Sequence, residues 1–162
     1  ARLVEKRDGP AKRHPAEQRL QSALFPKRSI TIGHPLKIAV FAHVRHPISE
    51  PFMGGMEAHC RMLCDGLRAN GHDVTLFAAG GSVDDQFVPI CDAPYEAVLP
   101  WVTWRGTEAL AQYQRAAFEA GWAIVRAGGF DLVHNNTLFP DLIEWAARDR
   151  IACVTSHHVP PF

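Results

Sequence analysis

The sequence lacks several features that mark common classes of protein. Its 162 residues contain no run approaching the roughly 18 consecutive apolar residues of a membrane span, so we expect a soluble chain. No glycine-rich loop ends in Lys-Ser or Lys-Thr, and none has the GxGxxG spacing, which argues against a Walker A loop and the dinucleotide-binding fingerprint. There is also no internal repeat.

Cysteine is scarce, with four residues in the chain and no pair at CxxC spacing. Cys60 and Cys64 lie four residues apart on one face of an expected helix, and Cys153 lies in an apolar run. Cysteines in such places act as small core hydrophobes, so we expect buried free thiols rather than disulfides. Free thiols indicate a reducing compartment, and we therefore expect a cytoplasmic location.

Arrangements typical of metal or nucleophilic catalysis are missing as well. The pair His157-His158 has no carboxylate and no third histidine at ligand spacing in its segment, so we expect no metal. No Cys-His or Ser-His-Asp order suggests a nucleophile. His43 and His46 flank the loop after the first apolar run, and we expect at least one of them to line a ligand cleft.

The formal net charge of zero hides an uneven distribution. Residues 1–34 hold eight Lys/Arg and three Asp/Glu, whereas the remainder holds nine and fourteen. This basic segment contains prolines and few apolar residues, so we expect an extension, partly disordered or helical, ahead of a domain over residues 35–162. It is either a solvated tail or a segment that adheres to an anionic membrane surface, and we expect no nucleic-acid partner.

What the chain does contain is an alternation of apolar runs and amphipathic helices. An apolar run at 36–42 precedes a polar loop, a helix whose apolar positions recur from Met56 to Leu67, and a second apolar run at 73–78. Gly71 is a helix stop between them. A strand, loop, helix and strand in this order make a βαβ unit, the seed of a parallel sheet.

The second half continues the alternation. We expect an irregular stretch at 80–106 with a short strand near 97–99, and then four further elements: a helix at 107–126, a strand at 130–134, a helix at 138–148 and a strand at 151–155. The pattern predicts an α/β, Rossmann-like open parallel sheet with helices on both faces. Such sheets bind ligands at the carboxyl ends of their strands.

Two polar segments fall at these predicted ends. Gly54-Gly55 precedes a helix, whose unpaired N–H groups and dipole favour an anion such as phosphate, although a plain tight turn fits equally well. The run from His134 to Thr137 follows a strand and suits hydrogen bonding to a polyol such as a sugar. Alternatively, Asn136 or Thr137 caps the next helix.

Three motifs in order resemble the N-terminal domain of glycosyltransferase family 4, whose enzymes have the two-domain GT-B fold. GGMEAH and NGHDVTLFA resemble the family's GG-x-E-x-H loop and GH-x-V strand. FDLVHNN resembles its F-D-h-h-H-x-H strand end, and IACVTSHHVPP its strand ending in T-x-H. Together they cover residues 36–162.

The resemblance implies roles for individual residues. Gly54 and Gly55 would approach the diphosphate of a nucleotide-sugar donor, and Glu57 and His59 match polar positions of the helix near the sugar and acceptor cleft. His134 matches the first histidine of the strand-end motif.

Two further positions come from the later motifs. Asn136 stands where many members have a second histidine close to the transferred sugar, and His157 matches the T-x-H histidine. Asn136 can hydrogen bond a sugar hydroxyl but cannot exchange a proton near neutral pH. We expect Asn136 to face the sugar and Asn135 to point the opposite way along the extended segment.

The resemblance therefore implies the acceptor-side domain of a retaining hexosyltransferase that moves a sugar from a nucleotide diphosphate sugar to a hydroxyl acceptor, with no metal and no other cofactor. The family's C-terminal domain, with its E-x7-E motif, is missing from the chain, so we expect the chain alone to be inactive. Two alternatives stay open: a GT-B-fold nucleotide-sugar epimerase, and a stand-alone Rossmann-like binding module.

Overall fold

The computed structural model describes residues 34–158. The extension predicted for residues 1–34 lies outside the described residues, apart from His34, and stays a prediction. Between residues 34 and 158, no helix is long and apolar enough to span a bilayer.

Five parallel strands form one sheet in the order β3-β2-β1-β4-β5. Their bounds are β1 Lys37–Ala42, β2 Asp73–Ala79, β3 Phe87–Cys91, β4 Leu132–Asn136 and β5 Ala152–Thr155. The chain builds outward from β1 through β2 to β3 and then returns to the other side of β1 with β4. The direction of winding therefore reverses between β1 and β4, as in a doubly wound α/β fold.

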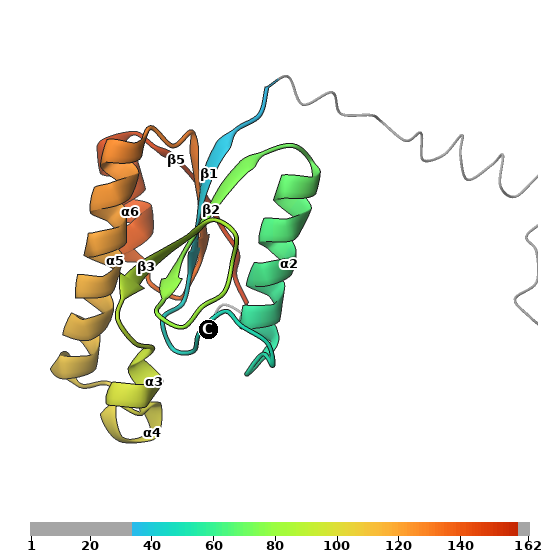
Figure 1. The fold of residues 1–162 in the computed structure, drawn as a ribbon. Helices are drawn as coiled ribbons and strands as arrows, with labels where there is room; N and C mark the ends of the chain where they lie inside the picture. Colours follow the sequence, from blue (N-terminus) through green and yellow to red (C-terminus); the bar gives the residue numbers. More distant parts are fainter. Residues whose placement is uncertain (1–33, 159–162) are drawn as a thin grey trace, which may run out of the picture. The chain divides into compact units, whose positions relative to one another are not determined.

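Helices cover both faces of this sheet, which confirms the predicted Rossmann-like class. Their bounds are α2 Gly55–Ala69, α3 Tyr95–Val98, α4 Trp101–Trp104, α5 Glu108–Gly128 and α6 Asp141–Asp149. Figure 1 shows α5 and α6 on one face and α2 on the other, with α3 and α4 below the lower ends of the strands.

The alternation of side chains along β1 explains how both faces are filled. Val40 points into the cluster that contains Cys60 and Cys64 of α2, whereas Phe41 points toward α5. The ring of Phe41 stacks on Phe77 with centroids 4.9 Å apart. Burial of apolar side chains on both faces of the sheet stabilises the fold by roughly 25 cal/mol for each Å² of apolar area removed from water.

One glycine allows α5 to approach the sheet closely. A Cβ on Gly121 would lie 2.8 Å from the Phe41 ring and 2.8 Å from Ile90. A larger residue there would force the helix away from the strands that carry the site.

The stretch at 80–106 differs from the prediction. The prediction of a short strand near 97–99 is wrong, because these residues form the end of α3 and the turn after it. The strand of this region is β3, which pairs with β2 and contains Pro89. A proline lacks the N–H for a sheet ladder and is tolerated here because β3 lies at the sheet edge.

The end of β4 also differs. The strand runs to Asn136 and not only to His134, so Asn135 and Asn136 lie within it rather than in a loop after it. The alternative that Asn136 or Thr137 caps the next helix is wrong, since the residue before α6 is Pro140.

The cysteines form no disulfide, as predicted from the sequence. All four are free, and Cys60 and Cys64 are buried on the face of α2 that packs against the sheet. Cys91 and Cys153 are half-buried.

Candidate functional site

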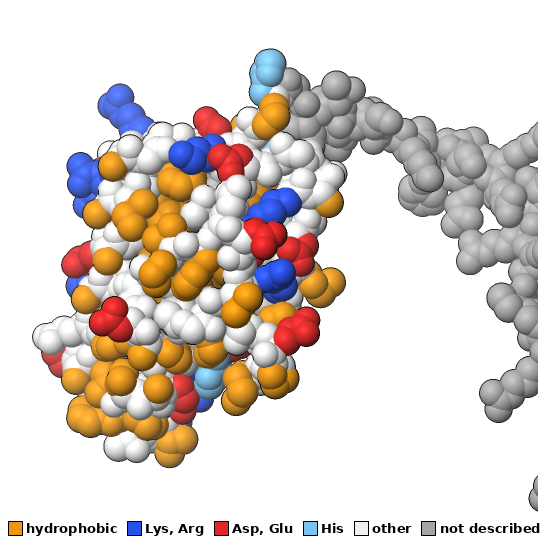
Figure 2. Space-filling view, in the orientation of Figure 1, with side chains coloured by type: hydrophobic (Ala, Val, Ile, Leu, Met, Phe, Trp, Pro, Cys, Tyr) orange, Lys and Arg blue, Asp and Glu red, His pale blue; other side chains and the backbone are white. Residues whose placement is uncertain are grey.

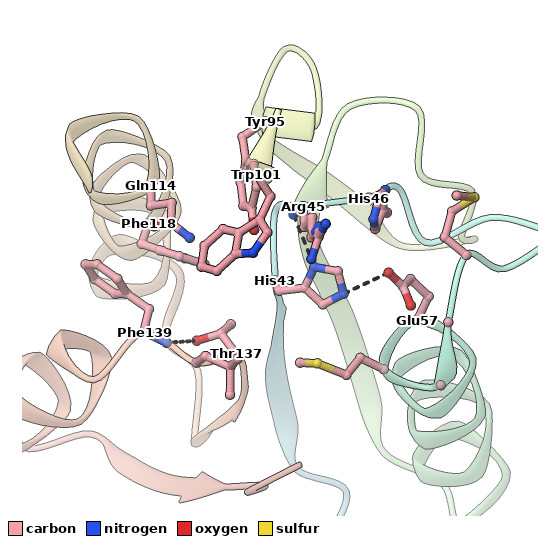
Figure 3. Close-up of a pocket in the computed structure, with 15 residues that line it drawn as sticks. His43, Arg45, His46, Glu57, Tyr95, Trp101, Gln114, Phe118, Thr137 and Phe139 are labelled. Carbon is pink, nitrogen blue, oxygen red and sulfur yellow. Dashed lines mark hydrogen bonds and ion pairs between the residues drawn. The ribbon is translucent and has the colours of Figure 1, made fainter. Parts of the chain in front are cut away.

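A pocket of about 490 Å³ opens at the carboxyl ends of β1 and β4, where the winding of the sheet reverses. This is the position at which doubly wound sheets bind ligands. The loop after β1, the start of α2, the loop after β4, and α3 to α5 all contribute to its wall (Figure 3). Its lining residues are His43, Arg45, His46, Met53, Gly54, Gly55, Met56, Glu57, Tyr95, Trp101, Gln114, Phe118, Thr137, Leu138 and Phe139.

One wall holds a histidine–carboxylate pair. Nε2 of His43 lies 3.1 Å from Oε1 of Glu57, and the Glu57 side chain is only 4% exposed. The backbone N–H of Arg45 donates to Nδ1 of His43 at 3.1 Å. Because Nδ1 accepts this hydrogen bond, the ring proton is on Nε2 and His43 donates it to Glu57.

Burial of the His43 side chain also favours the neutral form of its ring. Desolvation lowers the pKa of His43, and the nearby negative charge of Glu57 opposes this shift only in part. A neutral imidazole therefore holds one oxygen of a buried carboxylate at the edge of the pocket.

The glycine pair forms the adjoining wall. Gly54 is the residue before α2 and has an extended backbone with φ −169° and ψ −174°, and Gly55 is the first helical residue. A Cβ on Gly55 would meet no atom within 4 Å, whereas one on Gly54 would lie 3.2 Å from Oε2 of Glu57. The N–H groups of the first turn of this 15-residue helix thus border the pocket beside an unobstructed Gly55.

An aromatic wall stands opposite the polar one. Tyr95, Trp101, Phe118 and Phe139 line it, and Figure 3 shows the Trp101 indole between Phe118 and His43 in this view. The guanidinium of Arg45 lies over the Trp101 ring at 5.6 Å from its centroid. A planar apolar surface facing hydrogen-bonding groups is typical of sites for small ligands of mixed polarity.

The loop after β4 is shaped by a buried amide. Oδ1 of Asn135 accepts hydrogen bonds from the backbone N–H of Thr137 at 3.0 Å and from its hydroxyl at 2.7 Å. The Thr137 hydroxyl oxygen in turn accepts from the N–H of Phe139 at 3.0 Å. Asn135 thereby fixes the backbone that presents Thr137 and Phe139 to the pocket.

Other predicted site residues gather on the α2 face of the sheet, outside this pocket. Asn136 is 1% exposed, and its Oδ1 is hydrogen bonded to Nε2 of His158. The His158 ring packs edge-on against His59 with centroids 4.8 Å apart. Nε2 of His134 lies 2.8 Å from the hydroxyl oxygen of Ser156.

The structure thus separates the predicted residues into two groups. Gly54, Gly55 and Glu57 meet at the pocket, while His59, His134 and Asn136 lie near one another on the α2 face. His157 is exposed. Asn135 and Asn136 do point to opposite faces, but Asn135 is the one bonded to the pocket loop.

Several pocket residues were not predicted from the sequence. His43 and His46 both line the pocket, but Arg45, Tyr95, Trp101 and Phe118 were missed as site residues. No signal in the sequence distinguishes Trp101 from a core tryptophan, because its exposure is known only from the structure. Within residues 34–158, no group of three or more His, Cys, Asp or Glu side chains is arranged to hold a metal ion.

Comparison with known proteins agrees with the fold. A comparison with curated proteins gave no match. The family model described as Glycosyltransferase Family 4 matches residues 53–162, a range that begins one residue before Gly54 and includes β2 to β5. Because this match covers more than half of the chain, the protein belongs to glycosyltransferase family 4.

Proposed function

We propose that this domain binds the acceptor, and part of the donor diphosphate, in a retaining transfer of a sugar from a nucleotide diphosphate sugar to a hydroxyl group. The observation that carries the proposal is the pocket at the reversal point of the sheet, bordered by the N-terminus of α2. Membership of a glycosyltransferase family supports a transferase.

Gly55 is the proposed approach point for the donor diphosphate. The first turn of a helix offers unpaired N–H groups and a favourable dipole to an anion. Glu57 is acidic and belongs to the same turn, so a diphosphate would avoid its carboxylate. Gly55 offers that route, because the space where its Cβ would stand is free of neighbouring atoms within 4 Å.

Glu57 is the proposed partner of the acceptor hydroxyl. Its Oε1 faces the Nε2–H of His43, while Oε2 lies on the Gly54 side of the pocket. A hydroxyl that donates to Oε2 would be held beside the diphosphate site, with the aromatic wall behind it. Such positioning, together with stabilisation of the leaving diphosphate, supplies the proposed catalysis.

The nucleotide would be held by a second domain. The acidic E-x7-E motif that the resemblance assigns to the C-terminal domain of the family does not occur in the 162 residues. In the proposed enzyme the pocket faces that domain, and transfer takes place only when both are present. No metal is required by this mechanism.

The anomeric configuration of the product tests this proposal. The domain would be produced together with its C-terminal partner and incubated with uridine and guanosine diphosphate sugars and hydroxyl acceptors. Proton NMR of the new glycoside should show the anomeric configuration of the donor. An inverted product, or conversion of the donor to its epimer without an acceptor, would contradict the proposal.

A further inference from the structure

Two hydrogen-bonding groups of the pocket wall have no partner among residues 34–158. Tyr95 lines the pocket and is only 5% exposed, yet its hydroxyl neither donates to nor accepts from any of these residues. The side-chain amide of Gln114, which is half-buried on α5, makes no hydrogen bond within the same range. Figure 3 shows Gln114 on the side of the pocket opposite Glu57, and the Tyr95 ring close to the Trp101 indole. Both polar groups are therefore available to a ligand.

The Tyr95 hydroxyl is not sealed inside the protein. In the described part of the chain, the fully enclosed side-chain atoms that lack a hydrogen-bond partner are Nε of Arg68 and Nδ2 of Asn136. Since the Tyr95 hydroxyl also lacks a partner but is not one of these enclosed atoms, it has access to open space, and Tyr95 lines the pocket.

The other tyrosine of the chain shows the more usual arrangement. The hydroxyl of Tyr113 donates to the carbonyl oxygen of Ala93 at 2.6 Å. A tyrosine hydroxyl that is withdrawn from bulk water normally has such a partner, because an unpaired polar group carries a desolvation cost. Tyr95 differs from Tyr113 at a place where a ligand can supply the missing partner.

The Tyr95 hydroxyl is also positioned before a ligand arrives. The backbone N–H of Tyr95 donates to the carbonyl oxygen of Val44 at 2.9 Å, which ties the start of α3 to the loop after β1. Burial raises the pKa of Tyr95, although the positive charge of Arg45 opposes this shift, so the hydroxyl keeps its proton at neutral pH. A fixed, neutral donor lowers the entropic cost of binding.

The chemistry of the two groups matches a hydroxyl rather than an anion. A tyrosine hydroxyl and a glutamine amide can each donate and accept hydrogen bonds. A ligand hydroxyl does both as well, so it can bond to Tyr95 and Gln114 together. The nearby cation, Arg45, is already paired with Glu96, with Nε and Oε2 2.8 Å apart.

Tyr95 and Gln114 are uncharged polar groups within a largely aromatic wall. Trp101, Phe118 and Phe139 line the same pocket, and Figure 2 shows hydrophobic side chains gathered over α3 and α4. Pockets of this kind orient a small ligand through a few well-placed polar groups among apolar ones. The C–H groups of a sugar ring give it an apolar face that can pack on aromatic rings while its hydroxyls reach the polar groups.

We propose that Tyr95 and Gln114 select a polyol acceptor, such as a sugar ring. One acceptor hydroxyl lies at Glu57, and a second hydroxyl bonds to Tyr95 and Gln114 across the pocket. An acceptor with a single hydroxyl would leave both groups desolvated and unpaired, which is how a polar site rejects an analogue that lacks a hydroxyl. This inference rests on the proposed function and specifies both the acceptor class and the residues that recognise it.

Binding to the 162-residue chain tests the inference without requiring transfer. NMR titrations followed through the indole N–H of Trp101 compare methyl glycosides of glucose, mannose and galactose with cyclohexanol, a ring of similar size with one hydroxyl. At least one glycoside should shift the signal in a saturable way. The absence of such a shift with all three glycosides would overturn the proposal.

Three variants locate the second hydroxyl. Tyr95→Phe and Gln114→Leu should each weaken binding of the glycoside about threefold or more, as expected for the loss of one neutral hydrogen bond, and leave cyclohexanol unaffected. Gln112→Leu is the control, because the amide of Gln112 donates to Glu108 at 3.0 Å and does not line the pocket. It should leave both titrations unchanged, and circular dichroism confirms folding. Unchanged glycoside affinity in either pocket variant, or an equal loss for glycoside and cyclohexanol, would refute the selection.

Transfer by the two-domain enzyme separates this inference from the proposed function. If sugar is transferred but Tyr95→Phe changes kcat/KM equally for glycoside and cyclohexanol acceptors, the proposed function stands and the polyol selection is wrong. The same holds if the loss depends on the donor sugar instead of the acceptor. If glycoside binding depends on Tyr95 and Gln114 but no donor gives transfer, the polyol site stands and the transfer proposal is wrong.

Discussion

His43, which follows β1, forms a largely buried pair with Glu57 in the first turn of α2. Nε2 of His43 and Oε1 of Glu57 lie 3.1 Å apart, and the two side chains are 14% and 4% exposed. The N–H of Arg45 donates to Nδ1 of the same ring, so the imidazole is neutral and its Nε2 proton faces the carboxylate. The pair holds Glu57 with one oxygen toward the glycine loop. In our account this oxygen receives the acceptor hydroxyl.

The first prediction concerns this carboxylate. Glu57→Gln keeps the shape of the side chain but removes its charge. It should lower kcat/KM of the two-domain enzyme by a factor that corresponds to about 1.5–3 kcal/mol of lost transition-state stabilisation, the range for a hydrogen bond to a charged group. Steady-state kinetics with varied acceptor checks it. Asp65→Asn, on an exposed carboxylate of the same helix, is the control and should retain wild-type kinetics. Normal turnover in a folded Glu57→Gln variant would remove Glu57 from the site.

The second prediction concerns acid stability. Burial lowers the pKa of His43, His134 and His158 in the folded protein, with neighbouring positive charges contributing. The unfolded chain keeps histidine near its ordinary pKa of about 6.5 and so binds protons first as the pH falls. Stability should therefore be full above about pH 6.5 and decline below it.

Urea unfolding at several values between pH 7.5 and pH 5 measures this decline. His134→Gln removes one contributing group and should make the decline shallower. An unfolding free energy that is constant over this range would show that the three imidazoles do not resist protonation.

The third prediction separates the two asparagines of β4. Asn135 accepts two hydrogen bonds from Thr137, so Asn135→Ala should lower the unfolding free energy by roughly 1–3 kcal/mol. Asn136 is buried, but its Nδ2 has no hydrogen-bond partner among the described residues, so Asn136→Ala removes a desolvated group and should cost less.

Denaturant unfolding and turnover of both variants test this. The sequence predicts that Asn136 contacts the transferred sugar and that Asn135 matters less for turnover. If turnover falls mainly in Asn136→Ala, that role stands. If it falls mainly in Asn135→Ala, the loop that carries Thr137 is the more important element of the site.

The fourth prediction concerns the isolated chain. It should show no sugar transfer and only weak affinity for uridine or guanosine diphosphate sugars, because most donor contacts are proposed to lie in the other domain. Calorimetry should give a dissociation constant well above 1 μM, which corresponds to about −8 kcal/mol. Submicromolar binding would mean that this domain holds the nucleotide by itself.

Most of the fold could be predicted from the sequence because local pattern and tertiary burial agree. The apolar run of β1 is buried on both faces, as in a central parallel strand, and the periodic stripe of α2 meets it through Cys60 and Cys64. Gly71 adopts φ +88° after α2, a conformation that glycine favours. In these segments the local sequence pattern and the tertiary packing favour the same secondary structure.

Where the predicted secondary structure was wrong, tertiary contacts determine the structure that forms. Residues 95–98 form a helix whose first N–H, on Tyr95, donates to the carbonyl oxygen of Val44 after β1, a contact that no local pattern shows. β4 extends through polar Asn135 and Asn136 because the ladders with β1 and β5 pair this backbone. Polarity alone suggested a loop there.

The pocket residues also fall into those that the sequence could predict and those that only tertiary packing brings to the pocket. Gly54 and Gly55 could be predicted to lie together at the pocket because they precede and begin one helix, whereas Glu57 was predicted only from the family resemblance. Trp101 and Phe118 reach the pocket from α4 and α5, and their place depends on how α5 crosses the sheet. Sequence spacing carries no information about that crossing.

The central claim is that a donor diphosphate approaches the open backbone at Gly55, and a matched pair of substitutions on α2 tests it most directly. A Cβ at either Gly55 or Gly66 would meet no atom within 4 Å, so valine should be tolerated structurally at both positions. The measurement is the sugar-transfer rate of the two-domain enzyme, with melting temperature as the check on folding. We expect Gly55→Val to abolish transfer at an unchanged melting temperature and Gly66→Val to retain it. Near-normal transfer by a folded Gly55→Val variant would contradict the account.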